Sequence, residues 1–163
     1  MKNKFMKMAV AGLVLGASSF ANAGLIFNNG SAISNSSRCA ETSGACGGTW
    51  TIFDDFTVTN DSQITSVSWT AILYGGISDY NFSNIWFYDN DPVFDAGKLL
   101  FSHSAAGIVV ANSLRANAFD ITLSGFSKLL TSGTYWLGIQ HNTDTNYGTV
   151  ATTGRTLNAT QWQ

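Results

Sequence analysis

Apolar and polar residues alternate along short stretches of this chain, most clearly over residues 64–74. One parity of that stretch carries Ser and Thr, and the other is apolar: Val67, Trp69, Ala71 and Leu73. Successive side chains of a strand point to opposite faces, so the pattern predicts a strand with one buried face. Residues 52–58 repeat the alternation, and the polar residues 60–62 predict the turn between these two strands.

Residues 82–88 are apolar and aromatic on both parities, which predicts a strand that is covered on both faces. The chain offers further short strands at 25–27, 99–101, 108–110, 119–123, 135–139 and 149–152. His141 continues the inward parity of the strand at 135–139, and residues 124–131 have room for one helical turn. Short strands separated by polar turns are typical of an all-β fold. We therefore expect an antiparallel β-sandwich, jelly-roll-like, with a closed barrel as the alternative.

The N-terminal segment has the three parts of a secretory signal. Residues 1–7 are basic, residues 8–20 are apolar and uncharged, and Ala21-Asn22-Ala23 has the small-x-small form of a cleavage site. The apolar run is too short to span a bilayer well, although an uncleaved anchor is the alternative. The pattern predicts a signal peptide over residues 1–23, cleavage between Ala23 and Gly24, and one domain over residues 24–163.

Removal of this segment changes the charge of the chain. All three Met and three of the eight basic residues lie in it, which leaves 140 residues with five basic and ten acidic side chains, a net charge of −5. Nucleic-acid binding is excluded, because it needs clustered Lys and Arg. The sequence predicts a secreted protein, extracellular or in the cell envelope, with no membrane span in the mature chain.

Both cysteines, Cys39 and Cys46, lie in the predicted mature domain. An oxidising compartment and an even count predict a disulfide between them. The bond would pin a flexible polar loop that contains Glu41, and closing so short a loop stabilises the fold by less than about 3 kcal/mol. A metal site at the two cysteines is disfavoured, because neither histidine of the chain is near them in sequence.

An acidic turn supplies the one candidate metal site. Asp89, Asn90, Asp91 and Asp95 offer the oxygen ligands that calcium prefers, although the turn does not follow the EF-hand pattern. The alternative is a solvated turn in which these side chains accept bonds from backbone N–H groups. Calcium is the one cofactor that the sequence suggests.

Two aromatic residues, Trp86 and Tyr88, are candidates for ligand binding, because flat rings can stack on sugars. The alternative is that they belong to the core, where aromatic side chains bury large areas. Catalytic residues are not predicted. The chain lacks a Gly-x-Ser-x-Gly elbow, and nothing selects an Asp pair, such as Asp54 and Asp120, for glycoside hydrolysis.

Several stretches resemble, in the same order, the exported bacterial proteins of the PEP-CTERM class. They are Phe53–Val58 with Ile64–Trp69, Ile85–Asp91 with Lys98–Leu100, Phe119–Ile121, and Gly133–Ile139. The resemblance covers roughly residues 24–155. It implies a secreted β-sandwich of unassigned activity that exosortase sorts to the envelope or the exopolysaccharide matrix, with extracellular polysaccharide or envelope components as partners.

The C-terminal sorting tail of that class has no counterpart in this sequence. The chain ends at Gln163 without a Pro-Glu-Pro motif, an apolar helix or a basic end. We therefore expect a truncated copy or a soluble relative, in which residues 156–163 pack poorly. The predicted function is a non-catalytic domain of the bacterial surface or extracellular matrix. The alternative is a carbohydrate-binding module with exposed aromatic residues and structural calcium.

Overall fold

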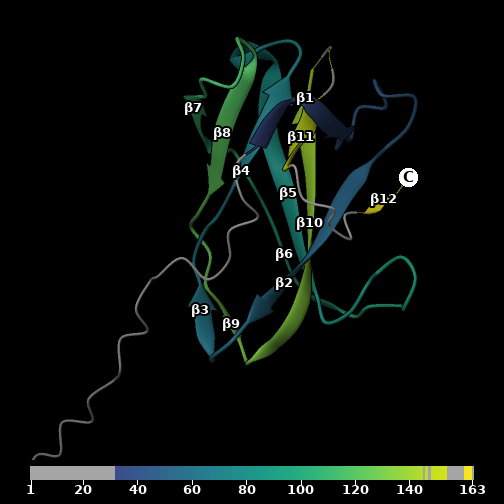
Figure 1. The fold of residues 1–163 in the computed structure, drawn as a ribbon, viewed down its shortest axis with the longest axis vertical. Helices are drawn as coiled ribbons and strands as arrows, with labels where there is room; N and C mark the ends of the chain where they lie inside the picture. The colour runs from purple at the N-terminus through teal and green to yellow at the C-terminus, as the bar shows by residue number, and fades with distance from the viewer. Residues whose placement is uncertain (1–31, 145, 147, 154–159, 163) are drawn as a thin grey trace, which may run out of the picture.

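Most of the chain that the structure describes is β-strand, in antiparallel sheets that pack on one another (Figure 1). The computed structural model describes residues 32–144, 146, 148–153 and 160–162. The predicted all-β sandwich is confirmed. The predicted signal peptide, its cleavage site at Ala23 and Gly24, and the strand at 25–27 lie outside the described residues.

Two five-stranded sheets form the sandwich. Sheet A runs in the order β1 (Ala32–Cys39), β11 (Gly148–Thr153), β4 (Val67–Leu73), β8 (Ala118–Leu123) and β7 (Ile108–Ala111). Sheet B runs in the order β12 (Thr160–Trp162), β2 (Thr51–Val58), β10 (Gly133–Thr143), β5 (Tyr80–Tyr88) and β6 (Leu99–Ala105). A small third sheet pairs β3 (Ser62–Ile64) with β9 (Lys128–Leu130), and a 3₁₀ turn spans Ile77–Asp79.

The alternation along β4 sorts its side chains as the sequence predicts. Ala71 and Leu73 are fully buried between the sheets, and Trp69 packs against the same core. On the outer face, Ser68 and Thr70 form hydrogen bonds with side chains of β8. The core contains residues of both sheets: Phe56, Val58, Ile85, Phe87, Tyr135 and Ile139 from sheet B, and Ala71, Leu73, Phe119, Ile121 and Leu123 from sheet A.

Three features of the chain differ from the sequence-based expectation. The helical turn at residues 124–131 is wrong: β9 lies there, with Leu130 buried and Leu129 exposed, an alternation too short to recognise. Strand β1 was missed because its residues are mostly Ser, Asn and Arg. The turn at 60–62 leads from β2 in sheet B through β3 to β4 in sheet A, so the two flanking strands do not pair.

Candidate functional site

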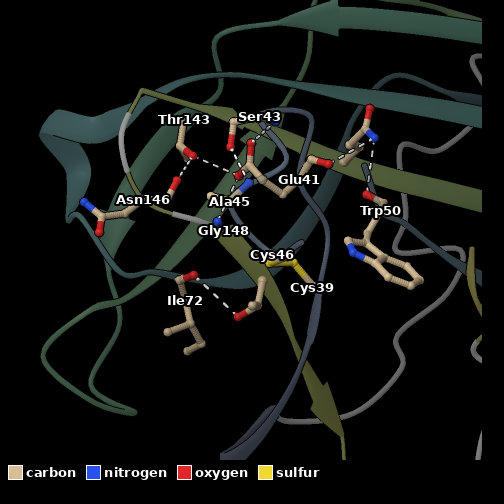
Figure 2. The surroundings of a disulfide bond; sticks show 12 residues. Cys39, Glu41, Ser43, Ala45, Cys46, Trp50, Ile72, Thr143, Asn146 and Gly148 are labelled. Carbon is tan, nitrogen blue, oxygen red and sulfur yellow. Dashed lines mark hydrogen bonds between the residues drawn. A yellow bond between two sulfur atoms is a disulfide. The ribbon is translucent and has the colours of Figure 1, made fainter. Parts of the chain in front are cut away.

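Residues 39–50 form a corner at which the chain passes from sheet A to sheet B (Figure 2). The Ala40 amide donates to the Gly148 carbonyl of β11, and the Ala40 carbonyl accepts from the His141 amide of β10. A disulfide joins Cys39 to Cys46, with 6.5 Å between their Cα atoms, as predicted. The corner therefore ties the two sheets together at one end of the sandwich.

The side chain of Glu41 occupies the centre of this corner and is fully buried. One carboxylate oxygen, Oε1, accepts the backbone N–H groups of Thr42 and Ser43, each at 2.9 Å. The other, Oε2, accepts the Thr143 hydroxyl and the Gly148 amide, also at 2.9 Å (Figure 2). Three of these partners are backbone N–H groups, which can only donate, and this suits a carboxylate, which only accepts. The single proton of the Thr143 hydroxyl is shared between Glu41 and the Asn146 carbonyl. The expectation that Glu41 lies in a flexible polar loop is wrong, because these donors hold it inside the fold.

A second buried polar group lies next to this corner in β10. The His141 ring is fully buried, its Nδ1 lies 2.9 Å from the Ser83 hydroxyl of β5, and its face stacks on Trp69 at 5.8 Å. The Ser83 oxygen lies 3.0 Å from the Tyr80 hydroxyl, which accepts the Gly107 amide. Burial lowers the pKa of His141 from 6.5 to about 3, so the ring is neutral at pH 7.

The Ser83–His141 pair has the distance of a nucleophile and its general base, but not the accessibility. A catalytic pair must reach a substrate atom, and both of these side chains are fully buried between the sheets. Their hydrogen bond instead joins β5 to β10 inside the core. The two members of the example carboxylate pair, Asp54 and Asp120, lie on different sheets, in β2 and β8.

The acidic turn after β5 is held by its own side chains. Asp91 is buried, and its Oδ1 accepts the backbone amides of Val93 at 2.8 Å and Phe94 at 3.2 Å. Asn90 accepts the amide of Asp91 at 2.9 Å, and Asp89 accepts that of Lys98 at 2.7 Å. Asp95 is exposed. These contacts are those of a turn whose side chains accept hydrogen bonds from backbone N–H groups, the alternative to a calcium site.

Metal binding at this turn stays a prediction. Among the residues that the structure describes, no group of three or more His, Cys, Asp or Glu side chains is arranged to hold a metal ion. Calcium at Asp89, Asn90, Asp91 and Asp95 would have to draw on carbonyl and amide oxygens as well as carboxylates.

The two aromatic candidates share the outer face of sheet B with two further rings. Trp86 and Tyr88 are half-buried, whereas Phe53 and Trp136 beside them are buried. Antiparallel register places Gly138 between Phe53 and Trp86, and Trp136 next to Tyr88. We call Phe53, Trp86, Tyr88 and Trp136 the aromatic face. The sequence predicted a strand covered on both sides, and the cover on this side is partial.

The glycine at the centre of the aromatic face explains how the rings pack. A Cβ atom added to Gly138 would lie 2.6 Å from Cε1 of Phe53 and 3.2 Å from Cε3 of Trp86, so these rings extend over the bare backbone. Phe53 also meets Tyr88 edge to face, with ring centroids 5.8 Å apart. Partial burial raises the pKa of the Tyr88 phenol above its ordinary value. The rings therefore form one packed surface that is open at Trp86 and Tyr88.

Comparisons with models of known protein families, with curated proteins and with solved structures find no match. Within the described residues, the structure contains no helix that is long and apolar enough to cross a membrane. The case for a function therefore depends on the residues of the corner and of the aromatic face.

Proposed function

We propose that this protein is an exported, non-catalytic domain of the bacterial surface or extracellular matrix, as its resemblance to PEP-CTERM proteins implies. The observation that carries the proposal is the Cys39–Cys46 disulfide at the corner between the sheets. Disulfides persist in oxidising compartments outside the cytoplasm, which agrees with the secretory pattern of the first 23 residues.

The buried groups at the corner support a structural role. Glu41 and His141 have the chemistry for acid–base catalysis, but both are fully buried. The hydrogen bond of His141 joins β10 to β5, and those of Glu41 join the corner to β10 and β11. A surface or matrix domain needs a fold that survives outside the cell. A corner closed by a disulfide and by four hydrogen bonds to one carboxylate supplies that resistance.

Cell fractionation of an expressing bacterium tests this proposal. We expect the protein outside the cytoplasm, with an N-terminus at Gly24 by mass spectrometry and no thiol that reacts with an alkylating agent until a reductant is added. A cytoplasmic protein with free thiols would refute it. Replacing both cysteines by serine should lower the free energy of unfolding by about 2–3 kcal/mol, as expected for so short a loop.

Carbohydrate binding is the second candidate, and the aromatic face is the observation that favours it. Trp86 and Tyr88 present partly exposed rings side by side on β5, and polar residues, among them Asn84 and Asp55, share that face of the sheet. Stacking rings combined with polar side chains that bond hydroxyl groups suit a saccharide. An extracellular polysaccharide is the partner that this surface would take.

Binding to a polysaccharide panel, followed by tryptophan fluorescence, separates the two candidates. We expect Trp86→Ala to abolish any binding and Tyr74→Ala, which removes an exposed ring outside the aromatic face, to preserve it. Repeating the measurement with a chelator tests the predicted calcium site. If no polysaccharide binds with or without calcium, only the first candidate remains.

A further inference from the structure

The two sheets of the sandwich end in four edge strands, and three of them have a feature that hinders pairing with another chain. The register of β1 shifts between Ala32 and Ser37, and β12 pairs with β2 over only three of the residues that the structure describes. Strand β6 has a bulge at Leu100, which has no partner residue in β5. The carbonyl of Leu100 accepts a hydrogen bond from the Lys128 ammonium at 3.2 Å. Irregular, short and lysine-covered edges are the usual means by which proteins avoid edge-to-edge association.

The fourth edge, β7, is also short, with four residues, but among the described residues it has neither a register shift nor a covering lysine. Its four residues pair with β8 in an unbroken register, and they include no charge and no proline. Ile108 is 65% exposed and Val110 is 58% exposed, while Val109 between them packs against the core. Within the described part of the chain, no strand pairs with the other side of β7. A regular apolar edge of this kind is a template for strand addition.

The hydrogen-bond pattern shows which backbone groups this edge offers. The Asn112 amide, one residue beyond β7, donates to the Ala118 carbonyl of β8 at 2.9 Å. Because paired residues alternate along an antiparallel ladder, Ile108 and Val110 bond toward β8. The N–H and C=O groups of Val109 and Ala111 therefore point away from the sheet, where a further strand would meet them.

We propose that β7 pairs antiparallel with β7 of a second copy of this chain, so that sheet A continues from one copy into the other. A twofold axis at Val109 lets the Val109 N–H of each copy donate to the Val109 C=O of the other. Ile108 of each copy then lies opposite Val110 of the other, and pairs of β-branched side chains stabilise such a ladder. The partner is a second copy because a neutral, apolar strand is complementary to itself.

The charges near β7 do not oppose this pairing. The nearest acid on the same face is Asp120, which lies opposite Val110 in β8 and is bonded by Thr70 and Asn112. In the dimer, three strand spacings of about 4.8 Å separate the two Asp120 side chains, so they lie about 14 Å apart or more. That distance exceeds the screening length of about 8 Å at physiological salt.

The geometry also limits the assembly to two copies. Each copy contributes the same edge to an isologous contact, and the contact consumes that edge in both. The contact is small, because β7 has four residues. We therefore expect a weak dimer, with a dissociation constant on the order of 10 μM to 1 mM.

Analytical ultracentrifugation of the protein isolated from cells that express the full chain tests the proposal. We expect a monomer–dimer equilibrium between about 1 μM and 1 mM, which spans the constant estimated above. Two double variants, Ile108→Glu with Val110→Glu and Ile108→Lys with Val110→Lys, should each be monomeric because like charges would face each other. An equal mixture of the two should form dimers again, because every cross-strand pair is then of opposite charge.

A matched control and three outcomes make the proposal refutable. Leu129→Lys alters a side chain on β9 that is as exposed as Ile108, at 65%, and should leave the dimerisation constant unchanged. A wild-type protein that stays monomeric over the whole range overturns the proposal. So does a mixture of the acidic and basic variants that stays monomeric, or growth of the wild type beyond the dimer.

Discussion

The buried histidine of β10 should make the stability of the fold depend on pH between 7 and 4. His141 is enclosed by Trp69 and Tyr80, its Nδ1 meets Ser83, and within the described residues its Nε2 has no hydrogen-bond partner. Protonation would place a charge inside a fully buried site. Burial therefore holds the pKa of the folded-state ring at about 3, against 6.5 for an exposed histidine.

The size of the effect follows from the difference in bound protons. Below pH 6.5 the unfolded chain takes up a proton that the folded chain refuses until the pH approaches 3, so stability falls as the pH falls through this window. The slope approaches 1.4 kcal/mol per pH unit. Between pH 7 and pH 5 the free energy of unfolding should drop by about 2 kcal/mol from this histidine alone.

Urea denaturation followed by tryptophan fluorescence at pH 7, 6 and 5 measures the drop. His141→Asn keeps an amide that can bond Ser83. Whatever the stability of this variant at pH 7, the drop in its free energy of unfolding between pH 7 and pH 5 should be about 2 kcal/mol smaller than that of the wild type. The matched control is His103→Asn, the same change at the other histidine of the chain, which should retain the drop. An equal pH dependence in wild type and His141→Asn would refute the reasoning. Should the variant not fold, an NMR titration of the wild-type ring decides, because a His141 signal that titrates near pH 6 contradicts the argument.

Two further substitutions test the corner and the aromatic face. Glu41→Gln places an amide NH₂ against two of the four buried donors. In urea titrations this change should lower the free energy of unfolding by about 2–4 kcal/mol. The control, Asp95→Asn at an exposed position, should change the free energy of unfolding little. Gly138→Ala forces a Cβ atom against the Phe53 ring and should destabilise the fold by about 1–3 kcal/mol. Gly133→Ala in the same strand meets no atom closer than 3.5 Å and should fold normally; equal melting temperatures for the two alanine variants would contradict this account.

The sequence predicted the strands better than their partners. Alternation in β4 and β10 reports which side chains face the core, and the burial of Leu73, Tyr135 and His141 agrees with it. The same alternation contains no information about which strand lies alongside. The neighbours β2 and β4 therefore entered different sheets without any signal in the residues between them.

The corner was predicted only in its covalent part. Cysteine count and compartment predicted the disulfide, which requires nothing from the rest of the fold. The burial of Glu41 depends on donors at Thr143 and Gly148, about a hundred residues further along the chain. Neither donor differs in sequence from the many other Thr and Gly residues of this chain, so local reasoning could not find them.

The pairing of early strands with late ones determines when this sandwich can form. Strand β1 pairs with β11, and β2 lies between β10 and β12, so both wait for partners from the last fifth of the chain. During synthesis the first hundred residues have none of those partners available. Because such long loops must close before β1 and β2 can pair, we expect folding in milliseconds to seconds after the last strands have been made. A polypeptide whose two sheets cannot close until its last strands have been made can still pass through a narrow channel as an extended chain throughout its synthesis.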